Sequence, residues 1–155
     1  MRNFKQAFTM IELVFVIVVL GVLAAIAVPK FAANRTDAQM AKARASIASI
    51  RSSIVSERQV RLIKGDNKYI NKLHSSDTTL FDGNGTSELL MYGIKAKDED
   101  GHWQTAPTAG TGSATGKEIW VYEYKILSKT NKFTYTQEKG TFLCTDGDFC
   151  PKLTD

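Results

Sequence analysis

The chain has 155 residues, enough for one modest domain once an apolar N-terminal run is set aside. Hydrophobic residues make up 43% and charged residues 23%, which excludes a wholly disordered chain. The net charge of +4 invites a nucleic-acid-binding interpretation, but residues 30–72 carry ten basic and three acidic side chains, and residues 73–155 carry eight basic and twelve acidic ones. A basic stalk followed by an acidic head is not the uniformly basic surface of a nucleic-acid binder.

The first element in chain order is an apolar run from Phe8 to Val28. With about 21 residues, it is long enough to cross a bilayer as a helix, and it shows no periodicity, so every face suits lipid. A secretory signal peptide is the competing interpretation, but no small-residue cleavage site leads from the run into a clear mature start. Glu12 lies inside the run, and a lone carboxylate there costs on the order of 2.5–3.5 kcal/mol on insertion scales. A plain membrane anchor gives no reason for that acid.

The stretch KQAFTMIELVFVIVVLGVLAAIAVP, residues 5–29, resembles the N-terminus of type IV pilins and type II secretion pseudopilins. In that family a short basic leader ends in a small residue. Phe-Thr, a Glu at the fifth mature position and often a Pro near the twenty-second follow it. The resemblance implies a leader of residues 1–7, cleavage between Ala7 and Phe8, and N-methylation of Phe8. Ala7 stands where the family usually has Gly, which bears on the efficiency of cleavage.

The same resemblance implies that Glu12 of an incoming subunit pairs with the N-terminal amine of a neighbour. An unpaired Glu12 would penalise the solitary subunit in the low-dielectric bilayer, and pairing would relieve that penalty on assembly. The alternative is an interfacial Glu that stays hydrated. Gly21 and Pro29 bracket a stretch that, by resemblance, melts when subunits pack, because proline removes a helical hydrogen bond. An ordinary helix end is the alternative for Pro29.

The resemblance also implies partners and a location. The partners are further copies in a homo-oligomeric filament, a prepilin peptidase, an inner-membrane assembly platform and membrane lipid. The location is the bacterial inner membrane, crossed once with the C-terminal head in the periplasm, and later the pilus or pseudopilus. Arg2 and Lys5 favour a cytoplasmic leader, whereas Lys30 and Arg35 on the other flank argue the opposite way.

The second element is an amphipathic stalk helix over residues 29–64, which contains no Gly or Pro between residues 31 and 63. Alternating steps of three and four predict one apolar stripe that packs on the head: Met40, Ala43, Ile47, Ile50 and Ile54. A coiled-coil seam is the alternative. A row of arginines seven apart flanks the stripe at Arg44, Arg51 and Arg58. We expect this row to be solvated or, in a sharper interpretation, to bridge acidic heads of adjacent subunits.

The third element is a globular head over residues 65–155. Residues 80–91 predict a short helix or turn structure, and the breaker-rich residues 104–116 predict a loop. The stretches KEIWVYEYKIL, NKFTYTQ and TFLC, joined by hairpin-length connectors, predict an antiparallel meander. Trp120, Tyr122, Tyr124 and Ile126 should lie on its buried face, alternating with Val121, Glu123 and Lys125. The expected fold class is therefore α+β: a long N-terminal helix packed on a small antiparallel sheet, as in pilins.

Cys144 and Cys150 permit a disulfide, a metal pair or two free thiols by spacing alone. A disulfide is expected if the head lies outside the cytoplasm; in the loop-entropy model so short a ring contributes roughly 2–2.5 kcal/mol. Between the cysteines, Asp146 and Asp148 resemble a calcium loop, although two carboxylates are too few for a full oxygen shell. We otherwise expect no cofactor. Asn84 in DGNGT fits a bacterial N-glycosylation acceptor, or a plain turn.

Catalysis has little support in this sequence. His74 and His102 lie in polar, turn-like settings, and no phosphate-binding glycine loop precedes a helix, so we expect no enzyme. The expected function is a structural filament subunit serving secretion, adhesion, motility or DNA uptake. A nucleic-acid-binding minor pilin of a competence system and a monomeric membrane-anchored binding domain are the alternatives.

Overall fold

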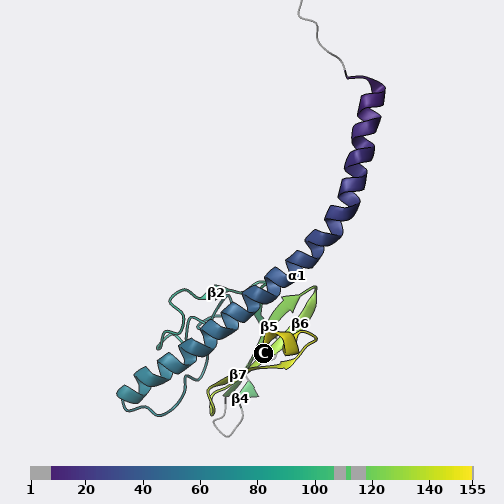
Figure 1. Ribbon diagram of the computed structural model, residues 1–155. Coiled ribbons are helices and arrows are strands. Elements are labelled where there is room, and N and C mark those ends of the chain that lie inside the picture. The colour runs from purple at the N-terminus through teal and green to yellow at the C-terminus, as the bar shows by residue number, and fades with distance from the viewer. Residues whose placement is uncertain (1–7, 107–110, 113–117, 155) are drawn as a thin grey trace, which may run out of the picture. The chain divides into compact units, whose positions relative to one another are not determined.

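The computed structural model describes residues 8–106, 111–112 and 118–154. Its first element is one long helix, α1 (Met10–Ile63), drawn from purple to teal in Figure 1. The chain divides into two compact units, Met1–Asp37 and Ala38–Asp155, and the boundary falls inside α1. The expected stalk, residues 29–64, therefore belongs to both units, and its larger part belongs to the unit that contains the head.

The second unit is organised around the apolar stripe of α1. Met40 is half-buried, and the other four residues of the stripe are at most 2% exposed: Ala43, Ile47, Ile50 and Ile54. They share one hydrophobic core with the strands that lie beside this part of α1 in Figure 1. Full burial of one such isoleucine contributes about 1.5–3 kcal/mol. The predicted packing of the stripe on the head is confirmed, and the coiled-coil alternative is wrong, because the head of the same chain covers it.

The arginine row attaches the head to the helix. The Nε–H groups of Arg44 and Arg51 donate to the carbonyl oxygens of Lys152 (2.7 Å) and Phe142 (3.0 Å). The guanidinium of Arg58 lies over the ring of Tyr69, 4.6 Å from its centroid. The prediction of a merely solvated row is therefore wrong, because each guanidinium contacts the head of its own chain. Ion pairs from this row to neighbouring subunits stay a prediction.

The main sheet is antiparallel, with strand order β3-β5-β6-β7, and β4 pairs with β5 beside that path. Its strands are β3 (Trp103–Thr105), β4 (Thr111–Gly112), β5 (Glu118–Ile126), β6 (Lys129–Thr136) and β7 (Thr141–Asp146). A separate pair is formed by β1 (Thr79–Leu80) and β2 (Ile94–Lys95). The predicted meander is confirmed. The predicted loop is wrong at residues 104–105 and 111–112, which are strand, and its residues 107–110 and 113–116 lie outside the described residues.

The alternation predicted for β5 holds on one face and fails on the other. Tyr122, Tyr124 and Ile126 are fully buried, and Trp120 is half-buried. Glu123 is also buried, at 8% exposed, although its position predicts the solvent face. Its carboxylate accepts a 2.8 Å hydrogen bond from Nε2 of Gln104 on the neighbouring strand β3. A pattern within one strand carries no information about this partner.

Aromatic side chains fill the core between the helix and the sheet. The Trp103 ring lies 4.9 Å from that of Tyr124 and 5.0 Å from that of Phe133, centroid to centroid. Its indole N–H also donates to the Ser46 hydroxyl of α1 at 3.0 Å. The core residue Trp103 thus ties the sheet to the helix by packing and by one hydrogen bond, which satisfies its only donor.

Residues 81–91 form turns, so the helix alternative for residues 80–91 is wrong and the turn alternative is confirmed. Gly83 takes a φ of 105°, and a Cβ atom at this position would lie 1.8 Å from the carbonyl oxygen of Ser87. Only glycine fits so close an approach of two backbone segments.

The chain ends in a short helix, α2 (Cys150–Leu153), which is fastened to the sheet. A disulfide joins Cys144 of β7 to Cys150, and Leu153 is buried in the core. The predicted disulfide is confirmed. It fastens α2, whose Lys152 carbonyl oxygen accepts the hydrogen bond from Arg44, to strand β7.

Candidate functional site

The apolar segment is exposed along its described length. Its large side chains are all at least 40% exposed, from Phe8 (74%) through Val19 (40%) to Val28 (66%). Within the described residues, α1 is the helix that is long and apolar enough to cross a membrane, by length and composition. An apolar surface of this size needs a covering that the unit itself does not supply.

Glu12 forms a capping box with Thr9 at the start of α1. The backbone N–H and the hydroxyl of Thr9 lie 3.4 and 3.3 Å from Oε2 of Glu12, and the Glu12 N–H donates back to the Thr9 hydroxyl oxygen at 3.3 Å. This reciprocal pairing satisfies donors that the first turn of a helix leaves free. Thr9 is a neutral hydrogen-bond partner and not a counter-charge, so the predicted penalty on Glu12 in a solitary subunit stays a prediction. Its pairing with a neighbour's amine stays a prediction.

Gly21 and Pro29 both lie inside α1, which is helical on either side of each. A Cβ atom placed on Gly21 would meet nothing within 4 Å, so no packing among the described residues requires glycine here. Pro29 interrupts the hydrogen-bond ladder without ending the helix, so the helix-end alternative is wrong. Melting between these two residues on assembly stays a prediction. Ala7 and the rest of the leader lie outside the described residues.

The cysteine ring carries two ion pairs. Asp146 lies 3.3 Å from the ammonium of Lys132, and Asp148 pairs with Lys129; both lysines come from β6. Among the described residues no three His, Cys, Asp or Glu side chains group to hold a metal ion. A calcium ion here would have to displace both lysines and take most of its ligands from carbonyl groups and water.

Asn84 holds a turn through its side chain. Its Oδ1 accepts the N–H groups of Thr86 (3.1 Å) and Ser87 (2.8 Å), and its Nδ2 donates to Oδ1 of Asn71 at 2.8 Å. The turn interpretation explains these contacts. A glycan would have to be attached at the nitrogen that now bonds Asn71.

The two histidines lie apart in different settings. His74 is fully buried, and its Nδ1 lies 2.8 Å from the hydroxyl of Tyr122. Burial lowers the pKa of His74 to about 4, and the charge of Lys72 acts in the same direction. Nε2 of His74 makes no hydrogen bond within the part of the chain that the structure describes, and it lies 3.4 Å from Oδ1 of Asp77. His102 contacts the backbone carbonyl of Asp100 at 3.2 Å. The predicted polar setting is wrong for His74, which serves the core.

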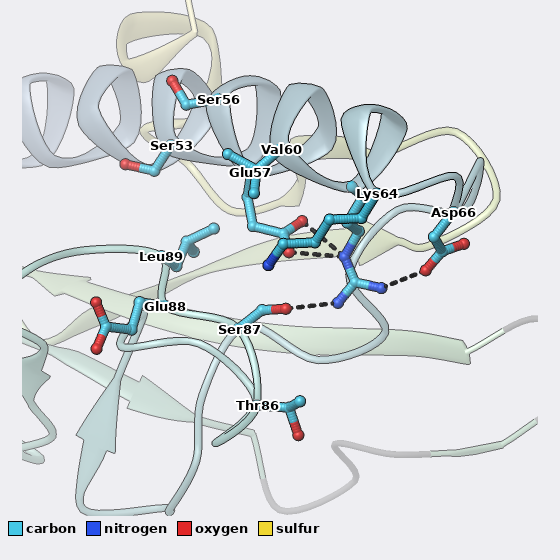
Figure 2. Close-up of a pocket in the computed structure, with 11 residues that line it drawn as sticks. Ser53, Ser56, Glu57, Val60, Lys64, Asp66, Thr86, Ser87, Glu88 and Leu89 are labelled. Carbon is cyan, nitrogen blue, oxygen red and sulfur yellow. Dashed lines mark hydrogen bonds and ion pairs between the residues drawn. The ribbon is translucent and has the colours of Figure 1, made fainter.

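A charge network at the end of α1 escaped the sequence analysis. The Nε of Arg61 lies 2.7 Å from Glu57, which is 7% exposed, and its two terminal nitrogens lie 2.9 Å from Asp66 and from the hydroxyl of Ser87 (Figure 2). A backbone hydrogen bond from Lys68, together with Arg61, lowers the pKa of Asp66. The i,i+4 spacing of Glu57 and Arg61 was a local signal for one of these bonds. The bond to Asp66 is also local, five residues along the chain, whereas the bond to Ser87 joins the helix to a loop 26 residues away.

Comparisons with known proteins agree with the N-terminal pattern. Residues 2–28 match the prokaryotic N-terminal methylation motif. The chain is 26% identical over 117 residues to a fimbrial protein of Pseudomonas aeruginosa, covering 72% of each chain. It is 25% identical over 128 residues to the type IV major fimbrial protein FimA of Dichelobacter nodosus, covering 83% of this chain and 67% of that protein. No solved structure matches the chain significantly.

Proposed function

We propose that the chain is a type IV pilin-like structural subunit that is cut between Ala7 and Phe8, N-methylated at Phe8 and polymerised through its apolar N-terminal helix. A prepilin peptidase makes the cut, and an inner-membrane assembly platform extracts the subunit into the filament. The subunit waits in the inner membrane with its head in the periplasm, where the Cys144–Cys150 disulfide is stable.

One observation carries this proposal: the segment from Phe8 to Val28 exposes large apolar side chains on all sides, with Glu12 as its sole charge. Lipid covers these side chains before assembly, and the same segments of other copies cover them afterwards. The capping box with Thr9 gives Glu12 a partner in the membrane. Assembly then exchanges that neutral partner for the charged amine of a neighbour, which is the stronger one at low dielectric.

The outer face of α1 in the second unit supports contacts between copies. It runs at steps of three and four through exposed residues without charge: Ala41, Ala45, Ala48, Ser52, Val55, Gln59 and Leu62. Small side chains let helix backbones approach closely. Contacts of this kind that do not close on themselves produce open helical polymers.

The decisive experiment is Glu12→Ala in the native host, with filaments measured as the sheared extracellular fraction. We expect loss of filaments with an unchanged amount of membrane-bound, disulfide-bonded subunit. Asp77→Asn is the matched control, because it removes an acid that is 81% exposed on the head and should leave filaments unchanged. Wild-type filament levels in the Glu12→Ala strain, or mature protein that retains residues 1–7 in mass spectra, would overturn the proposal.

Secretion, adhesion with motility, and DNA uptake are the roles that such a filament could serve in this host. Deletion of the gene followed by assays of each process distinguishes them. A role in DNA uptake through direct binding predicts a steep loss of DNA affinity with salt.

A further inference from the structure

The head has a cleft between the last turns of α1 and the loop at residues 86–89, shown in Figure 2. Its volume is about 510 Å³. Val60 from the helix and Leu89 from the loop give it an apolar lining, and Val60 is 48% exposed. The Arg61 network with Glu57 and Ser87 fixes the two walls relative to each other. The cleft is therefore preformed.

An exposed leucine stands on a strained turn at another place on the head. Leu127 and Ser128 connect β5 to β6 with φ values of 51° and 60°, a region that suits glycine and asparagine. The turn is held by a 2.6 Å hydrogen bond from the Ser128 N–H to Oδ1 of Asp100. Leu127 is 53% exposed at its tip. A residue that suits neither the backbone conformation nor the solvent indicates a role outside the fold.

Among the described residues, each of these two places has one cationic and one anionic side chain without a partner. Lys64 and Glu88 line the cleft. Lys97 and Glu99 are exposed, in the segment just before Asp100, which binds the Leu127–Ser128 turn. The side chains of these four residues form no hydrogen bond or ion pair within the part of the chain that the structure describes. Neighbouring charged side chains already form ion pairs within the chain: Asp98 with Lys125, and Arg61 with Asp66.

The two places lie at opposite ends of the head. The ammonium of Lys42, near the start of α1 in this unit, donates to the carbonyl oxygen of Gly101 at 2.8 Å. Gly101 follows Asp100, which binds the Leu127–Ser128 turn, so this turn lies near Lys42. The cleft begins at Ser53 and extends past Val60. The 18 residue-to-residue steps from Lys42 to Val60 span about 27 Å of helix. Leu127 therefore cannot reach the cleft of its own chain.

We propose that Leu127 of one copy inserts between Val60 and Leu89 of the next copy. Glu99 then faces the neighbour's Lys64, and Lys97 faces its Glu88. The proposal rests on the proposed filament function and names an axial contact between heads within it. The contact is heterologous, so it repeats without closing. The contact is small. It can form because the N-terminal helices already hold the heads of neighbouring copies at high local concentration.

The first test is Leu127→Asn in the full-length chain. Asparagine tolerates the left-handed conformation, so the melting temperature of the head should stay the same or rise. Filaments in the sheared fraction should fall about tenfold, because the buried apolar contact is lost. Leu143→Thr is the matched control, since Leu143 is 51% exposed on β7, and it should leave filament yield unchanged.

The second test is reversal of the paired charges. Lys64→Glu and Glu99→Lys should each reduce filament yield, and the double variant should restore it. Lys68→Glu, an exposed lysine that does not line the cleft, should have no effect. Failure of the double variant to restore filaments overturns the contact, as does wild-type yield in Leu127→Asn. Either result leaves the filament function intact if Glu12→Ala still abolishes filaments, whereas absence of wild-type filaments refutes the function itself.

Discussion

The two parts of α1 have the same backbone conformation and opposite surroundings. From Met10 to Asp37, the large apolar side chains are exposed, as at Leu13 (53%) and Val18 (58%). From Ala38 to Ile63, the apolar stripe is buried by the head, with Ile50 fully covered. The first part depends on lipid or other copies, and the second depends on its own chain. Mutations in the two parts should therefore change different measurements.

The largest expected effect is that of Trp103→Ala in the core. Trp103 is 1% exposed, and its removal leaves a cavity and takes away the hydrogen bond that its indole N–H donates to the Ser46 hydroxyl. We expect the free energy of unfolding of the head to fall by about 3–5 kcal/mol. Urea unfolding of the detergent-solubilised chain, followed by the fluorescence of Trp120, measures it. Val18→Ala should leave that transition unchanged; an equal loss in both variants would contradict the division into two parts.

The next effect is a dependence on pH through His74. Burial lowers the pKa of His74 to about 4, whereas its pKa in the unfolded chain is near 6.5. Between these two pH values the unfolded chain binds a proton at His74 and the folded head does not. The free energy of unfolding is therefore highest above pH 6.5 with respect to this group, and it decreases as the pH falls towards 4. At about 1.4 kcal/mol per pH unit, the loss reaches about 3 kcal/mol. Urea unfolding at pH 7, 5.5 and 4.5 measures it, and His74→Gln should flatten the slope in this window.

A smaller effect is expected for the arginine row. The half-buried Arg51 donates to the Phe142 carbonyl, so Arg51→Ala should lower the free energy of unfolding by about 1.5–3 kcal/mol. Arg44→Ala removes a similar bond at an exposed position and should lower it by less than about 1 kcal/mol. Thermal melts followed by circular dichroism compare them. The reverse order would show that exposure does not set the strength of these bonds.

The smallest effect is local and belongs to the apolar part. Thr9→Ala removes the hydroxyl of the capping box and should destabilise the first turn of α1 by about 1 kcal/mol. Amide hydrogen exchange of residues 10–13 in micelles should become faster, while the head keeps its melting temperature. Thr9→Ser preserves the hydroxyl and should exchange at the wild-type rate. Unchanged exchange in Thr9→Ala would show that the capping box does not form in the micelle.

The elements that the sequence predicted well are those with a local period. The stripe from Met40 to Ile54 repeats at helical spacing, and β5 alternates at strand spacing, so each pattern identifies its element and its buried face. The partners of polar side chains have no such period. The buried Glu123 has its hydrogen-bond partner Gln104 on the next strand, and the buried His74 has its partner in the hydroxyl of Tyr122. Both partners are distant in sequence.

By itself, the sequence determined the long helix, its apolar N-terminal half with a single acid, the buried stripe and the meander, because each follows from the chemistry of neighbouring residues. The tertiary structure alone decided which carbonyl oxygens Arg44 and Arg51 contact, and that a cleft opens beside Arg61. These features depend on where distant backbone segments or alternative side-chain partners come to lie, and no repeating pattern along the chain records that position.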